Sequence, residues 1–301
     1  MNIPIGELAA LGTSLCLSAT SILFTLAGRE VGGLTVNRAR LVLSVFFLSL
    51  THLTFLNTPV PLDAELERWL WLSLSGVVGL VIADACLFKA LILIGPRLTM
   101  LMMSLVPVVA TLMAWVIYAE TLKGTQVVGI MTTLCGIVWV VMDRGDHGNR
   151  EAMDGDFRGG ITFGLCAAVV TAAGMILAKK GLQGGFSAIS GNIIRTFAAA
   201  VSLLVYTIIK GEVGETFSRL CMHRRALVQI GIGTIVGPLV GLSLFLFSLQ
   251  KAPLGVSSTL MRLAPIFLLP FGYFYFKERF GWGSVIATVI SVIGVGMLFL
   301  L

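Results

Sequence analysis

The chain has 301 residues, of which 57% are hydrophobic and only 12% charged, and its mean hydropathy is +0.98. A soluble domain carries about 25% charged residues, so this composition excludes an ordinary soluble protein and indicates one that folds in lipid. The formal net charge of +6 comes from basic residues scattered singly through short polar stretches, which excludes a nucleic-acid-binding stripe.

Apolar segments follow one another along the whole chain, and each is close to the roughly 20 residues that a helix needs to cross a bilayer. They lie near residues 5–27, 35–56, 70–94, 98–118, 125–142, 159–178, 189–209, 227–249, 254–276 and 282–301. The N-terminal residues lack the basic stretch of a cleaved signal peptide, so the first segment is expected to remain as a span. The sequence therefore predicts an all-α membrane protein with ten transmembrane helices.

The two halves of the chain resemble each other. Sliding the sequence by 158 positions places Pro107 on Pro265, Glu120 on Glu278 and Gly136 on Gly294, and an offset of 155 places Asn37-x-x-Arg40 on Asn192-x-x-Arg195. Five spans per half is an odd number, so the second half starts on the opposite side of the membrane and the repeats are inverted. This predicts a first repeat over residues 1–142, a polar linker over 143–158 and a second repeat over 159–301.

A short pattern closes each half. The stretch Pro107…Tyr118-Ala119-Glu120-Thr121-Leu122…Gly129…Gly136 resembles the closing hairpin of the EamA domain of the drug/metabolite transporter superfamily, and Pro265…Phe276-Lys277-Glu278-Arg279-Phe280…Gly294 repeats it. The resemblance covers nearly the whole chain as two tandem domains. It implies a ten-helix fold with a central cavity lined by spans of both halves. It also implies secondary transport, often export, of metabolites such as amino acids.

Charged residues inside apolar segments are costly, and they are therefore the first candidates for a binding site. They are Asp84 and Lys89 in the third span, Arg262 in the ninth, and Arg40 and Arg195 near the starts of the second and seventh. Basic residues dominate this set, which favours a substrate with a carboxylate or phosphate group. Asp84 is the acid of the set, a candidate for proton coupling or else half of an internal ion pair with Lys89 or Arg262. A five-residue step on a helix turns by about 140°, so we expect its partner on another helix.

Arg262 is the favoured substrate ligand, because Ser257, Ser258 and Thr259 lie about one turn away on the same span. At the 158-residue offset, Lys89 and Arg262 face Phe247 and Ser104, so the duplication does not account for them. Arg40 and Arg195 recur in both halves, and they either line the cavity or extend to the lipid headgroups. Ser18 belongs to a polar stripe with Ser14 and Ser21 on the first span, which either faces the cavity or bonds to its own helix.

The resulting hypothesis is a secondary active transporter, working as an exporter of a small polar metabolite such as an amino acid or organic anion. Its expected partners are the substrate, the lipid bilayer and a proton or other coupling ion. No nucleotide-binding loop, nucleophile motif or metal-ligand spacing is present, so we expect no enzyme activity, cofactor or metal site. The alternative is a non-transporting membrane sensor or assembly protein.

The expected location is the cell (inner) membrane, as a multi-pass protein. Lys and Arg residues concentrate in the loops opposite the chain termini, with Arg97 counted among them, and this distribution places the termini outside the cytoplasm. The family resemblance implies cytoplasmic termini instead. The orientation therefore stays open at the level of the sequence.

Overall fold

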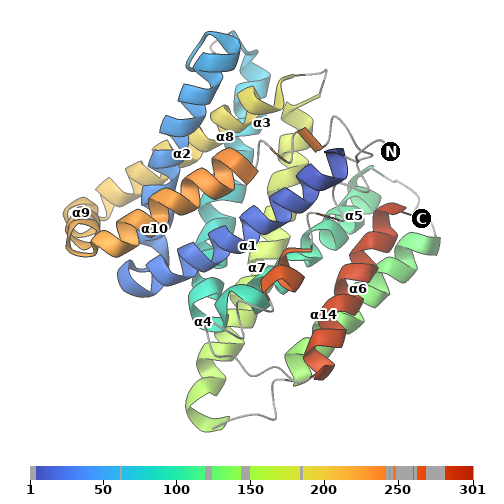
Figure 1. The fold of residues 1–301 in the computed structure, drawn as a ribbon. Helices are drawn as coiled ribbons and strands as arrows, with labels where there is room; N and C mark the ends of the chain where they lie inside the picture. Colours follow the sequence, from blue (N-terminus) through green and yellow to red (C-terminus); the bar gives the residue numbers. More distant parts are fainter. Residues whose placement is uncertain are drawn as a thin grey trace.

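The computed structural model describes residues 5–61, 63–118, 124–143, 150–183, 186–241, 244, 247–248, 260, 263–268 and 282–300, and within these ranges the regular structure is helical (Figure 1). The first half contains α1 (Ile5–Val31), α2 (Gly33–Leu56), α3 (Leu66–Gly76), the π-helix η1 (Val77–Ile82), α4 (Ala83–Met103), α5 (Leu105–Tyr118) and α6 (Gly124–Asp143). The second half contains α7 (Arg150–Gly181), α8 (Ala188–Ile209), α9 (Val213–Met222), α10 (Arg224–Thr234), the π-helix η3 (Ile235–Gly241) and α14 (Trp282–Leu300).

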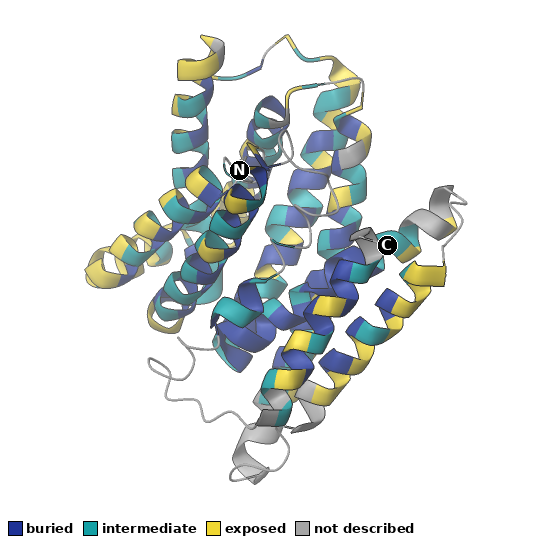
Figure 2. Cartoon of the chain, turned by 45° about the vertical axis from the view of Figure 1, so that its right-hand side comes forward, coloured by how far each residue is buried: buried dark blue, intermediate teal, exposed yellow. Residues whose placement is uncertain are grey.

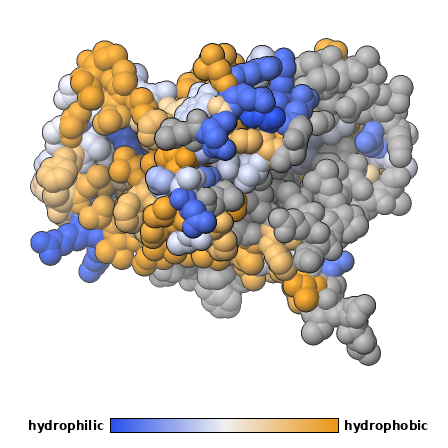
Figure 3. All heavy atoms as spheres, turned by 90° about the horizontal axis from the view of Figure 1, so that it is seen from above, coloured by the Kyte–Doolittle hydropathy of each residue, from blue (hydrophilic) through white to orange (hydrophobic). Residues whose placement is uncertain are grey.

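Several helices in this part of the chain are long and apolar enough to cross a membrane. These are Ile5–Val31, Gly33–Phe55, Leu66–Met103, Phe157–Ala178 and Ile189–Ile209. Apolar side chains also cover much of the described surface (Figure 3), with Phe46 62% and Val116 73% exposed. The buried residues lie on the inward faces of the helices (Figure 2). They include small polar groups such as Thr25 and Ser75. This arrangement is that of an integral membrane protein, because the solvent of the outer surface is lipid.

The third and fourth predicted spans are joined without an intervening loop. Gly95 takes φ 77° and ψ 169°, a conformation available almost only to glycine, and Pro96 follows with no N–H to donate. The helix on the far side of this break ends at Met103, and α5 begins at Leu105, so only Ser104 separates them. The interval between the predicted spans 70–94 and 98–118 is therefore a kink within α4 rather than a loop.

Two polar stretches differ from the expectation of simple loops. Residues 210–225 contain the separate helix α9, and α7 already begins at Arg150, inside the predicted linker. The predicted ninth span, residues 254–276, lies largely outside the described residues, as does the end of the eighth, so the number of ten spans remains a prediction.

The helices of the two halves pack in a reciprocal pattern. In the first half, α1 packs against α10 and η3, and in the second half α7 packs against α3 and η1. The helices α2 and α8 pack against each other, as do α6 and α14, which run side by side in Figure 1. The opening helix of each half thus lies against the third span of the other half, as expected for two repeats related by a pseudo-twofold axis.

The α6–α14 contact shows the same reciprocity at single residues. A Cβ on Gly136 would collide with Ser291 and the Ala287 carbonyl, and one on Gly294 would collide with Thr133 and the Gly129 carbonyl. The 158-residue offset relates Gly136 to Gly294, Thr133 to Ser291 and Gly129 to Ala287, so the two contacts are equivalent. The Thr133 hydroxyl also donates to the Ser291 carbonyl, at 3.4 Å. Glycine at both positions lets the two backbones approach closely, which is a usual basis of helix association in lipid.

Candidate functional site

A cavity of about 380 Å³ lies between the two halves. Helices α1, α2, η1 and α4 contribute to its wall from the first half, and α7, α8 and η3 from the second. Its lining is mostly apolar, with side chains such as Leu17, Phe24, Leu87 and Met175. The polar part of the wall is formed by Thr13, Thr20, Ser21, Arg40, Ser44, Asp84, Asn192 and Thr196.

The two π-helices occupy equivalent places in the repeats. Adding 158 to the bounds of η1 (Val77–Ile82) gives residues 235–240, and η3 spans Ile235–Gly241. A π-helical turn interrupts the regular hydrogen-bond ladder and is often found at functional sites. Both segments contribute cavity-lining residues, Leu80 from η1 and Pro238 from η3. The regular helix is therefore broken on both sides of the cavity.

Glycines bring the opening helix of each half close to these π-helices. A Cβ on Gly174 in α7 would lie 2.9 Å from the Cα of Gly79 in η1. In the other half, a Cβ on Gly237 in η3 would lie 2.8 Å from the Thr20 hydroxyl of α1. Both contacts leave no room for a side chain at the glycine, so they fix the position of the cavity wall.

Arg40 and Asp84 form an ion pair in the cavity wall. The Arg40 guanidinium donates to the Asp84 carboxylate, and both side chains are only 12% exposed. Arg40 also donates to Oδ1 of Asn37, at 3.0 Å, and Nδ2 of Asn37 donates to the Leu80 carbonyl in η1, at 3.1 Å. Asn37 thereby links the π-helix to the ion pair. The Arg40 guanidinium also lies 5.6 Å from the centroid of the Phe88 ring.

Arg195 supplies a second cation near the same carboxylate. Its backbone crosses α3 at Gly76, where any side chain would collide with it, and one guanidinium nitrogen would lie 3.5 Å from a Cβ on Gly79. Arg195 and Asp84 interact electrostatically, although Arg40 is the residue in direct contact with the carboxylate. At the 158-residue offset Asp84 corresponds to Leu242, so the second half has no acid of its own at this place. Two arginines thus share one aspartate, and the group carries a net positive charge.

The structure brings together Asp84, Arg40 and Arg195 and separates Lys89 from them. Lys89 is exposed, and its ammonium lies 4.4 Å from the centroid of the Phe163 ring on α7. It does not occur among the residues that line the cavity, because the five-residue step from Asp84 turns it to another face of α4. Asp84 pairs with Arg40, on another helix as expected, and not with Lys89; Arg262, the other expected partner, lies outside the described residues.

Ser18 is buried but does not line the cavity. Its hydroxyl is within hydrogen-bond distance of the Ser14 carbonyl, at 2.9 Å, and of the Ala264 carbonyl, at 3.1 Å, so it bonds to its own helix and to the other half. Its neighbour Ser21 does reach the cavity wall. The predicted residues Arg262, Ser257 and Ser258 lie outside the described residues.

Ser44 and Asn192 are polar cavity residues that the sequence did not select as ligands. The Ser44 hydroxyl is buried and, within the described part of the chain, has no hydrogen-bond partner. Ser44 follows Arg40 by four residues, and this one-turn spacing was the available signal. Asn192 belongs to the recurring Asn-x-x-Arg motif, which by itself indicated only the duplication of the two halves.

Arg97 corrects the sequence-based assignment of basic residues to loops. It is only 3% exposed, and its guanidinium donates to the Thr288 hydroxyl of α14, at 3.2 Å. The chain bends at Gly95 inside the helix bundle, and the Arg97 side chain, two residues later, therefore points into protein. Among the described residues, no three His, Cys, Asp or Glu side chains gather in a way that could hold a metal ion.

Both halves match one family model. The model of the EamA-like transporter family matches residues 4–142 and again residues 158–300. The chain belongs to the EamA-like transporter family. The EamA-like repeats correspond to the two halves whose reciprocal packing surrounds the cavity, and the fold is an all-α membrane fold with two repeats.

Two similar proteins agree with this membership. An "uncharacterized transporter" of Clostridium kluyveri is 27% identical over 188 residues, which cover 60% of this EamA-like chain and 56% of that relative. The matched part is thus little more than half the relative's length. A crystal structure titled only as that of a protein superposes with a TM-score of 0.62 at 17% identity, covering 98% of this chain and 96% of that one. This second likeness concerns the fold alone.

Proposed function

We propose that this protein is a secondary active transporter that exports a small organic anion or amino acid across the cell membrane by alternating access. The observation that carries the proposal is the cavity between the halves, whose wall holds the Arg40–Asp84 ion pair, with Arg195 as a second cation near the same carboxylate. A buried cation in excess favours an anionic ligand, and a guanidinium binds a carboxylate with two parallel hydrogen bonds. The membrane is the cell's inner membrane in this proposal.

Arg195 does not itself line the cavity but directly precedes the lining residue Thr196, and it is the proposed ligand of the substrate carboxylate. Arg40 is already neutralised by direct contact with Asp84, whereas no acid touches the Arg195 guanidinium among the described residues. Asn192 lies one turn before Arg195 on α8 and lines the cavity. The unpartnered Ser44 hydroxyl offers a further hydrogen bond. The remaining wall is apolar, so a substrate with a hydrocarbon body fits it best.

The two π-helices supply a physical basis for alternating access. Interrupted helices that flank a binding site between inverted repeats allow one repeat to rock against the other. Asn37 connects the η1 backbone to Arg40, so a change in the ion pair acts on the interrupted helix. Asp84 is the proposed coupling group, since its protonation would release Arg40. Replacing Asp84 with Asn should then abolish proton dependence of transport, and persistent pH-driven uptake would exclude Asp84 from coupling.

Reconstitution in liposomes tests the proposal. The purified protein is expected to move labelled carboxylates, selected beforehand by thermal-shift screening, without ATP. Arg195→Gln should raise the substrate concentration for half-maximal transport by about tenfold or more, because a charge-assisted pair contributes about 1.5–3 kcal/mol. Lys89→Gln, which removes an exposed cation outside the cavity, is the matched control. Binding without transport would favour the alternative of a membrane sensor, and strict ATP dependence would rule out secondary transport.

Arg262, Ser257 and Ser258 remain proposed substrate ligands from the sequence. Arg262→Ala is expected to weaken transport and leave folding intact, because no counterpart in the other repeat gives this residue a shared structural role. Unchanged substrate affinity in this variant would remove Arg262 from the site.

A further inference from the structure

The outer surface is hollowed where α9 meets α2 and α8. An apolar groove of about 330 Å³ runs between α2, α8, α9 and the start of α10. Its walls include Val42, Leu204 and Phe217, which are 60%, 51% and 70% exposed. On the membrane surface of a protein, such a groove is in contact with lipid. We propose that it binds one anionic diacyl phospholipid as a specific ligand.

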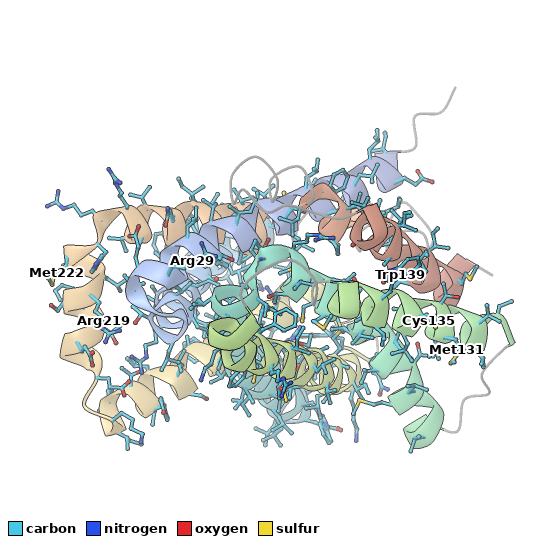
Figure 4. The ribbon with its side chains drawn as sticks, turned by 90° about the horizontal axis from the view of Figure 1, so that it is seen from below. Arg29, Met131, Cys135, Trp139, Arg219 and Met222 are labelled. Atoms are coloured by element: carbon cyan, nitrogen blue, oxygen red, sulfur yellow. The ribbon has the colours of Figure 1, made fainter. Side chains whose placement is uncertain are left out.

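Helix α9 forms one wall of this groove. Val213, Thr216, Phe217 and Leu220 all line it, and their spacing puts them on one side of the helix. The other side carries Glu215, Ser218 and Arg219, all exposed. A helix of ten residues is too short to span a bilayer, and one with an apolar and a charged side lies in the membrane interface. Figure 4 shows α9, with Arg219 and Met222, at the edge of the molecule beside the end of α1 that carries Arg29.

Arg38 stands where the apolar groove meets a polar pocket. It lines the groove, and with Thr216 it also lines a neighbouring pocket of about 270 Å³ formed by residues 31–35 and the polar side of α9. Its guanidinium donates to Glu212 and to the Thr216 hydroxyl, the latter at 2.6 Å. Its side chain is only 10% exposed, yet its Nε–H has no acceptor within the described structure. A phosphate or ester oxygen at the head of an acyl chain would supply this acceptor.

The charge at this end of the groove selects an anionic headgroup. Glu212 is paired with Arg38 and Glu215 with Arg219, so both acids of α9 and its preceding turn are already neutralised. Lys210 directly follows the end of α8, three residues after the groove residue Thr207, and Arg224 begins α10, three residues before the groove residue Leu227. The two cations therefore flank α9, one before it and one after it.

Lys210 and Arg224 are both exposed, and neither forms an ion pair in the described part of the chain. Both cations thus stand next to the groove wall that α9 forms, without an acidic partner among the described residues. A phosphatidylglycerol headgroup is the proposed occupant of this α9 side of the groove.

The length of the groove suits an acyl chain. Its residues on α8 extend from Thr207 down to Ala200, which at 1.5 Å per residue is about 10 Å along the helix. This distance covers the upper part of a fatty-acid chain in one leaflet. The cations that flank α9 and the apolar groove that continues from α9 along α8 thus follow the order of groups in a phospholipid.

Native mass spectrometry of the detergent-purified protein, titrated with dioleoyl phosphatidylglycerol or dioleoyl phosphatidylcholine, tests the proposal. We expect one phosphatidylglycerol to bind more tightly than phosphatidylcholine with the same chains. An exposed Lys or Arg near a membrane surface favours an anionic lipid about fivefold, so the double variant Lys210→Gln/Arg224→Gln should lower this affinity by about thirtyfold. Lys180→Gln, which removes an exposed cation from the end of α7, just before the start of α8, is the matched control and should leave the affinity unchanged.

A second variant tests the groove independently of charge. Ala200→Phe fills the groove and should reduce binding of both lipids while keeping the preference between their headgroups. Equal affinity for the two lipids in the unmodified protein would overturn the proposal, and so would unchanged phosphatidylglycerol binding in both variants. A dimer that dissociates on Ala200→Phe, with no change in bound lipid, would assign the groove to a second copy of the chain.

Discussion

The Arg40–Asp84 ion pair makes a quantitative prediction about stability. Both side chains are 12% exposed, and removing one partner of a buried pair costs about 3–5 kcal/mol because a charge is left without compensation. Asp84→Asn leaves two arginines near each other, so we expect a cost of about 3 kcal/mol, at the lower end because the pair borders a cavity that water can enter. Arg40→Gln should cost less, since Arg195 still compensates the carboxylate.

The double variant Arg40→Gln/Asp84→Asn isolates the interaction. Without either charge, the site keeps only Arg195 as an ion, and we expect the double variant to be more stable than Asp84→Asn alone. The coupling energy in the double-mutant cycle should lie between about 1 and 3 kcal/mol. Equilibrium unfolding in mixed micelles with increasing sodium dodecyl sulfate, followed by circular dichroism, measures all four proteins. Lys89→Gln should change stability by no more than about 1 kcal/mol. Additive costs of the two single variants would refute the assignment of Arg40 as the partner of Asp84.

Three further predictions concern packing and access. Gly136→Val should destabilise the protein by about 1–3 kcal/mol, because the new side chain would collide with α14. Gly231→Ala should not destabilise it, because the space around Gly231 is open. Equal effects of the two variants would contradict the α6–α14 contact. Gly95→Ala should cost about 1–3 kcal/mol in the same unfolding assay, since φ 77° with ψ 169° suits almost only glycine, and an unchanged midpoint would refute the kink. In a protein without its native cysteines, Ser44→Cys should react with a charged thiol reagent and be protected by substrate. Val42→Cys, on the lipid face, should not react, and the reverse pattern would rule out the cavity.

The resemblance between the halves was accessible from the sequence because duplication leaves matching residues at a constant offset. Gly136 and Gly294 illustrate this, since both pack a bare backbone against the partner helix. The π-helices at residues 77–82 and 235–241 share the same offset but gave no signal in the sequence. Whether a helix forms a π-turn depends on small backbone shifts, and tertiary packing determines these shifts. The hydropathy of the sequence carries no information about them.

The candidate site was only partly predictable, for a geometric reason. Helical spacing correctly excluded Lys89 as a same-face partner of Asp84, because local geometry fixes the angle between two residues on one helix. The same spacing could not choose Arg40, which is 44 positions away and reaches Asp84 only through the packing of α2 against α4. Arg97 was assigned to a loop because it follows Gly95-Pro96, and the structure places it inside the bundle.

The sequence by itself determined that this chain folds in lipid, that its two halves are repeats, and that ionisable groups lie within its spans. Those properties follow from hydrophobicity and from residue spacing along one chain. Only the tertiary structure decided which of the charges meet, namely Arg40 and Asp84 in the wall of a cavity between the halves with Arg195 near the same carboxylate, and which side chains face lipid instead. Helix rotation and crossing set these distances, and they depend on contacts between residues far apart in the sequence.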